Sequence, residues 1–137
     1  MEIKLDHIAV AVADIKDAVA TFESKLGLAC EKVETVPTER TTVAFFDLGG
    51  AHLELITPDD EEAPLARSLA KRGEGLHHIC LEVEDIELCL AALADKGVRL
   101  VNETPVPGAG GTRIAFVPPK SMHGVLIELV EKPRPAC

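Results

Sequence analysis

The sequence predicts an α+β fold built from two tandem βαβββ modules. Three observations predict it. Residues 5–15 match residues 76–86 without a gap, an amphipathic helical pattern follows each match, and three strand-like runs follow each helical pattern. A single module is too small to bury both faces of its sheet. We therefore expect one curved eight-stranded sheet around a cleft, with the helices on its outer face.

The first copy begins with a short apolar strand that ends near Asp14. Apolar residues then recur with helical spacing over 15–26, with Asp14 at the N-cap position and Gly27 at the C-terminus. Three strand-like runs follow, over residues 29–35, 42–48 and 52–56.

The second copy repeats this order. Asp85 occupies the N-cap position of a helical pattern that ends near Gly97. Strand-like runs are expected over residues 99–103, 113–117 and 125–130, and turns rich in proline and glycine separate them.

A length of 137 residues fits a single domain with one core. We expect the domain to span 1–137, with module one over about 3–56 and module two over about 76–131. The linker, over about 57–75, is acidic at first and then carries a short helical pattern around 64–71.

Composition limits the partners. The net charge of −9 argues against nucleic acid or an anionic membrane. No apolar run approaches the roughly 20 residues that span a bilayer, and the N-terminus lacks a signal-peptide pattern, so a cytoplasmic location is expected. The four cysteines show no C-x-x-C spacing, which favours reduced thiols.

Four ionisable residues occupy equivalent positions in the two copies. His7 and His78 lie in the first strand of each module, and Glu54 and Glu128 lie in the last. Because strand neighbours alternate faces, the aliphatic residues that flank each glutamate predict that its carboxylate points into the cleft.

A carboxylate in an apolar cleft is costly unless it is paired or bound to a metal. Two imidazoles and two carboxylates suit one divalent ion such as cobalt, manganese, nickel or zinc, and the lack of thiolate ligands argues against structural zinc. The alternative for a lone strand histidine is an ordinary core residue. His52 is a weak rival ligand, His77 is expected to be structural or to support His78, and His123 is expected to be exposed or near the substrate rather than a ligand.

Several stretches resemble a known family. Residues 6–9 and 127–129 resemble the vicinal-oxygen-chelate superfamily, which includes glyoxalases and bleomycin-resistance proteins. The longer stretches 71–80, 107–111, 119–121 and 124–129 resemble the methylmalonyl-CoA epimerase family within it. The resemblance covers the chain from Leu5 to Glu131.

The resemblance implies a metal ion bound by His7, His78 and Glu128, with Glu54 as the fourth ligand, and it implies a homodimer. Cobalt is the first expectation. The implied reaction interconverts the 2R and 2S forms of methylmalonyl-CoA by proton transfer at C2 through a metal-stabilised enolate. Our hypothesis is that Glu54 and Glu128 are both metal ligands and the two bases.

The sequence departs from part of that family at two positions. Phe45 stands where some epimerases have a glutamate base, which puts the second base in doubt and leaves Glu39 or a water as a rival. Pro118 stands where many relatives have histidine, which puts details of the last loop in doubt.

Lys120, Ser121 and Arg113 are the candidates for holding the substrate carboxylate or the coenzyme A phosphates. The alternative is that they are solvated surface residues. No G-x-x-x-x-G-K-[ST] or G-x-G-x-x-G motif supports a phosphate loop.

Rival functions use the same fold. A glyoxalase I-type isomerase, acting on a glutathione hemithioacetal, would use the same four ligands. A drug-binding or resistance protein would sequester a small molecule without chemistry and would need no complete ligand set. A ring-cleaving dioxygenase needs two histidines and one glutamate around ferrous iron, so the fourth ligand makes it less attractive.

Overall fold

The computed structural model describes residues 2–135. The chain forms two compact units, one of His7–His77 and one of residues 2–6 with 78–135. We call them the N-terminal unit and the C-terminal unit. No described helix combines the length and the apolar character needed to cross a membrane.

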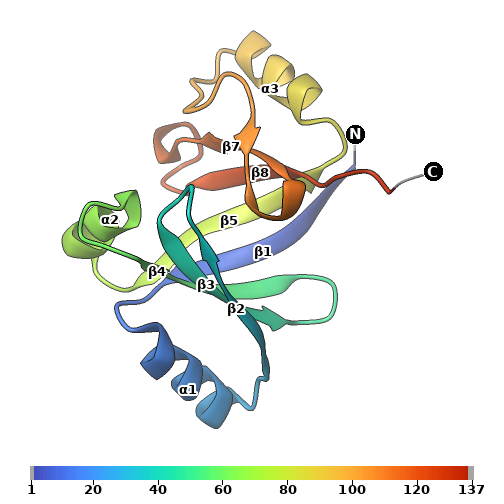
Figure 1. Ribbon diagram of the computed structural model, residues 1–137. Helices are drawn as coiled ribbons and strands as arrows, with labels where there is room; N and C mark the ends of the chain where they lie inside the picture. Colours follow the sequence, from blue (N-terminus) through green and yellow to red (C-terminus); the bar gives the residue numbers. More distant parts are fainter. Residues whose placement is uncertain (1, 136–137) are drawn as a thin grey trace. The chain divides into compact units, whose positions relative to one another are not determined.

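The N-terminal unit holds most of the first βαβββ module and the linker helix (Figure 1). Its elements are β1 (Ile3–Ala11), whose first four residues belong to the other unit, α1 (Ile15–Leu26), β2 (Cys30–Val36), β3 (Thr41–Asp47), β4 (His52–Pro58) and α2 (Pro64–Arg72). The strand order is β2-β3-β4-β1, with β1 parallel to β4 and the other pairs antiparallel.

The C-terminal unit repeats the arrangement (Figure 1). Its elements are β5 (Gly75–Val83), which begins in the N-terminal unit, α3 (Ile86–Asp95), β6 (Val106–Pro107), β7 (Arg113–Val117) and β8 (Ile127–Glu131), with 3₁₀ turns at Ala109–Gly111 and Pro119–Ser121. The strand order is β5-β8-β7-β6, with β5 parallel to β8. The predicted α+β class with two βαβββ modules is confirmed.

Each module helix covers one face of its own strands. In the N-terminal unit α1 packs on β3 and β4, where the fully buried Phe46 and Leu55 cluster with the nearly buried Val12. In the C-terminal unit α3 packs on β7 and β8, where Ile86 and Leu90 bury against Val117. The two module helices therefore each lie on one face of their own strands, as the sequence predicts. The linker helix α2 packs on the opposite face of the N-terminal strands, where Leu65 contacts the cluster that contains Ile56.

The same N-cap starts both helices. The Asp14 carboxylate accepts a hydrogen bond from the Asp17 amide at 3.1 Å, and the Asp85 carboxylate accepts one from the Leu88 amide at 3.0 Å. Both bonds satisfy an amide that has no partner inside the helix. Gly27 ends α1 with a φ of 71°, a left-handed conformation that glycine adopts without steric cost.

One predicted strand is wrong. Residues 99–103 do not form a strand, and the short β6 lies further along the chain. The Asn102 side chain accepts a hydrogen bond from the Phe116 amide at 2.9 Å, so a side-chain oxygen takes the place of a main-chain carbonyl. Pro105 has no amide hydrogen to extend a ladder.

Candidate functional site

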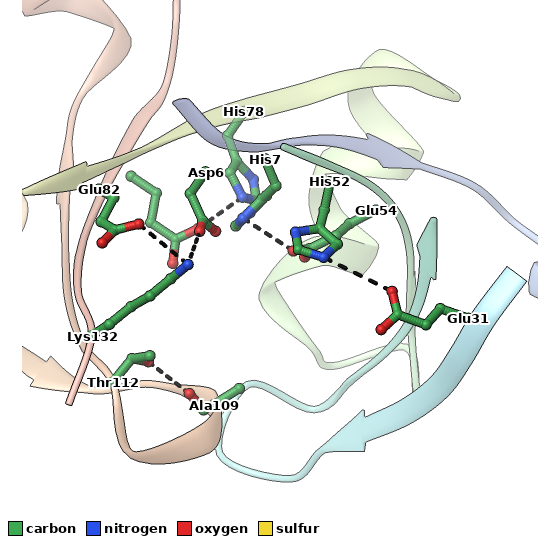
Figure 2. Close-up of polar contacts among 11 residues, drawn as sticks. Asp6, His7, Glu31, His52, Glu54, His78, Glu82, Ala109, Thr112 and Lys132 are labelled. Atoms are coloured by element: carbon green, nitrogen blue, oxygen red, sulfur yellow. Dashed lines mark hydrogen bonds and ion pairs between the residues drawn. The ribbon is translucent and has the colours of Figure 1, made fainter. Parts of the chain in front are cut away.

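His7 and Glu54 form a pair within the N-terminal unit. His7 Nδ1 lies 3.0 Å from Glu54 Oε2, and the two side chains are only 9% and 13% exposed. Figure 2 shows the contact between the imidazole on β1 and the carboxylate on β4. A carboxylate this buried requires a proton, a hydrogen bond or a cation beside it.

The alternation of β4 directs Glu54 to this face. Its neighbours Leu53 and Leu55 pack in the apolar cluster under α1, so the carboxylate points to the opposite face. Glu54 lies in register with Ala9 on β1 and with Phe45 on β3. Ala9 is fully buried and small, and Phe45 gives the carboxylate an apolar neighbour.

His78 and Glu128 form the matching pair within the C-terminal unit. His78 Nε2 lies 2.9 Å from Glu128 Oε1, and the side chains are 9% and 11% exposed. Ile127 and Leu129 pack in the cluster under α3, which turns Glu128 to the other face, as predicted. The Phe116 ring meets the His78 ring edge-on, with centroids 6.0 Å apart.

The two pairs have the donor chemistry of a divalent-metal site. Each offers one imidazole nitrogen and one carboxylate oxygen, which are ligands that borderline and hard divalent ions accept. Imidazoles and carboxylates bind metals in their deprotonated forms, so the affinity of such residues for a metal depends on pH. Each unit therefore offers one imidazole and one carboxylate of the kind that a divalent ion accepts.

The other histidines differ from these two. His52 Nε2 lies 3.9 Å from Glu31 Oε2, and its side chain is 38% exposed, so it sits in a solvated setting. His77 is half-buried beside His78 in the sequence, and His123 is exposed in a turn with a φ of 54°.

The three substrate-binding candidates lie in the C-terminal unit but in different surroundings. Lys120 is exposed in the 3₁₀ turn Pro119–Ser121, and Ser121 Oγ donates to the Arg99 carbonyl oxygen at 3.5 Å. Arg113 is ion-paired with Glu87 and, at 3.2 Å, with Glu131. The hydrogen bond to Glu87 raises the pKa of Arg113. An anionic substrate would compete with these carboxylates for Arg113.

Sequence reasoning missed one charged group on the same strands. Lys132 Nζ lies 2.8 Å from Asp6 Oδ1 and 3.2 Å from Glu82 Oε1 (Figure 2). The hydrogen bond to Asp6 raises the pKa of Lys132. The period-two spacing of Glu128 and Lys132 was the available signal, because it places both side chains on one face of β8 and its continuation.

The fold and the paired His–Glu residues define a class of protein. The chain belongs to the Glyoxalase/Bleomycin resistance protein/Dioxygenase superfamily, whose sequence profile matches residues 6–116.

Within that superfamily the chain is similar to methylmalonyl-CoA epimerases. It is 38% identical over 131 residues to the mitochondrial methylmalonyl-CoA epimerase of Dictyostelium discoideum, a match covering 94% of this chain and 78% of the relative. It is 44% identical over 128 residues to the uncharacterized protein YqjC of Bacillus subtilis, covering 93% and 91% of the two chains.

A solved structure extends the similarity to three dimensions. A variant of Streptomyces coelicolor methylmalonyl-CoA epimerase, in complex with 2-nitronate-propionyl-CoA, is 33% identical with a TM-score of 0.88. The match covers 96% of this chain and 98% of that one. Lactoylglutathione lyases are more distant, with 26% identity to a putative enzyme of Brassica oleracea.

Proposed function

We propose that this protein is a metal-dependent epimerase that interconverts the 2R and 2S forms of methylmalonyl-CoA. The observation that carries the proposal is the pair of nearly buried imidazole–carboxylate contacts, His7 with Glu54 and His78 with Glu128. The similarity to methylmalonyl-CoA epimerases, at 38% and 35% identity for the Dictyostelium and human enzymes, supports it.

In this proposal His7, Glu54, His78 and Glu128 together hold one divalent ion, with cobalt the first candidate and manganese, nickel or zinc as alternatives. The two modules would then each contribute two ligands. A bound ion would act as a Lewis acid toward the carboxylate and thioester oxygens of a malonyl thioester, and so make the C2 proton more acidic.

The glutamates supply the acid–base chemistry. Epimerisation at C2 requires that a proton leave from one face and return to the other, which calls for two groups that flank the carbon. Glu54 and Glu128 come from different modules, and each has an aromatic neighbour in register, Phe45 and Phe116. Such an apolar neighbour limits water around the carboxylate, which would accept the C2 proton in one direction of the reaction and return it in the other.

The substrate would be a coenzyme A thioester, and the solved relatives support this because one of them holds 2-nitronate-propionyl-CoA. Lys120 and Ser121 are proposed contacts for its anionic groups, and Arg113 would join them only by exchanging its ion pairs with Glu87 and Glu131. We also propose a homodimer located in the cytoplasm.

A coupled epimerase assay tests the function. A mutase specific for 2R-methylmalonyl-CoA is supplied with the 2S epimer, and product forms only if the protein inverts C2. The expected result is turnover that a chelator abolishes and added cobalt restores. The same preparation is assayed with the hemithioacetal of methylglyoxal and glutathione. Activity on that substrate alone would refute the epimerase function and support a glyoxalase I-type isomerase.

A further inference from the structure

Lys132 bridges two carboxylates at the end of the last strand. Its Nζ lies 2.8 Å from Asp6 Oδ1 and 3.2 Å from Glu82 Oε1, and all three residues belong to the C-terminal unit (Figure 2). The Asp6 side chain is only 14% exposed, whereas Glu82 is 33% and Lys132 is 47% exposed. The lysine therefore compensates one nearly buried carboxylate and one that water can reach.

Lys132 lies on the same side of its strands as Glu128. Glu82 pairs in register with Val130, and Cys80 pairs with Glu128, so β5 and β8 carry these side chains on one face. Val130 and Cys80 pack in one apolar cluster on that face. The lysine thus continues the row Glu128, Val130, Lys132 at alternate positions.

The duplicated module has no counterpart of this bridge. In the alignment of the two copies Asp6 corresponds to His77, Glu82 to Ala11 and Lys132 to Pro58. Asp6 belongs to the first copy, whereas Glu82 and Lys132 belong to the second, and the alanine and proline at the equivalent positions carry no charge. The bridge therefore occurs once, without an equivalent made by the exchanged residues of the two copies, so the duplicated fold itself does not require it.

The position of Asp6, directly before His7, indicates what the bridge does. Asp6 is joined by a peptide bond to His7, so a fixed Asp6 side chain also fixes the main chain from which the His7 imidazole projects. Removal of the lysine would leave a nearly buried carboxylate without this cation and next to the carboxylate of Glu82. Both effects favour movement of Asp6 toward water.

We propose that Lys132 is a positioning residue for the metal site, acting through Asp6 on the main chain at His7. The inference rests on the proposed function, because it assumes that His7 is a metal ligand. Residues behind the ligands orient them, and their substitution typically weakens metal binding by about 10–100-fold.

The test compares Lys132→Met with Lys132→Arg and with Lys32→Met. Lys32 is a matched control, because its Nζ lies 3.2 Å from Glu34 Oε2 and its side chain is 57% exposed. Isothermal titration with Co²⁺ alone gives the metal affinity, and thermal denaturation of the metal-free proteins separates positioning from loss of folding. We expect about tenfold weaker binding for Lys132→Met. Wild-type binding is expected for Lys32→Met, and largely restored binding for Lys132→Arg.

Asp6→Asn removes the same ion pair from the other side, because it keeps the shape of the side chain and removes its charge. The double variant with Lys132→Met should bind Co²⁺ no more weakly than the weaker single variant, because both changes break the same contact. Wild-type affinity in Lys132→Met, or a loss fully explained by unfolding of the metal-free protein, overturns the inference. The proposed function fails separately, if wild-type protein neither binds Co²⁺ nor inverts methylmalonyl-CoA.

Discussion

Each unit contains one pair of a histidine and a glutamate in contact, but some of the residues around the pair differ between the units. In the N-terminal unit Glu54 meets His7 through Nδ1, and its register neighbour on β1 is Ala9. In the C-terminal unit Glu128 meets His78 through Nε2, and its register neighbour on β5 is Cys80. Both pairs are nearly buried, and each glutamate has a phenylalanine in register, Phe45 or Phe116. Duplication has therefore preserved the polar contact and its aromatic neighbour, whereas the imidazole nitrogen that faces the glutamate and the register neighbour on the first strand differ.

The largest expected effect comes from removing one glutamate at a time. Glu54→Gln and Glu128→Gln should each lower epimerisation by about 10²–10⁴-fold, because a general base is lost in each case. If the two glutamates serve opposite faces of C2, each variant should still exchange deuterium into one epimer without inversion. Mass spectrometry of each epimer after incubation in D₂O measures this. Full activity in Glu54→Gln would refute the two-glutamate version.

The packing of the two modules differs at equivalent positions, Phe46 and Val117, which are both fully buried. Phe46→Ala should destabilise the protein by about 3–5 kcal/mol, because a large cavity remains next to Phe22. Val117→Ala should lower the free energy of unfolding by about 2 kcal/mol, since only two methyl groups leave the core. Urea denaturation measures both, with the exposed Val33→Ala as control. Equal losses of unfolding free energy in Phe46→Ala and Val117→Ala would contradict the expectation that the two cores are packed differently.

The smallest effect tests a feature that the copies share. Asp14→Ala and Asp85→Ala should each lower the free energy of unfolding by about 1 kcal/mol, because each removes the side-chain acceptor of a helix N-cap. Asp95→Ala, in the last turn of α3, is the control and should cost nothing, since a negative charge there opposes the helix dipole. A clear difference between the two N-cap variants, measured by thermal denaturation, would show that the two helix starts are not equivalent.

The sequence alone predicts the features that depend on local pattern. The repeat follows from the match between the two copies, and both N-caps follow from the aspartate ahead of each helical pattern. The face of Glu54 and Glu128, opposite that of their aliphatic neighbours, follows from the alternation of side chains along a strand. The direct contacts of Glu54 with His7 and of Glu128 with His78 were not predicted, because they depend on β1 lying beside β4 and on β5 lying beside β8.

Contacts between distant side chains could not be predicted in this way. The Asn102 side chain replaces a main-chain acceptor for Phe116, so a run that looks like a strand over 99–103 is not one. The ion pairs of Arg113 with Glu87 and of Lys132 with Asp6 join residues far apart in the sequence. Their partners depend on tertiary packing, and a residue pattern gives no distance between them.

The most direct measurement is the number of Co²⁺ ions bound per chain, because we propose that the two His–Glu pairs bind one ion jointly. Equilibrium dialysis against Co²⁺ followed by elemental analysis gives the ratio of ions to chains for the wild type, His7→Ala and His78→Ala, with His52→Ala as control. A single shared ion predicts one Co²⁺ per chain in the wild type and in His52→Ala, and loss of that ion in both other variants. Two ions per wild-type chain, or full occupancy after loss of either His7 or His78, would contradict the shared site.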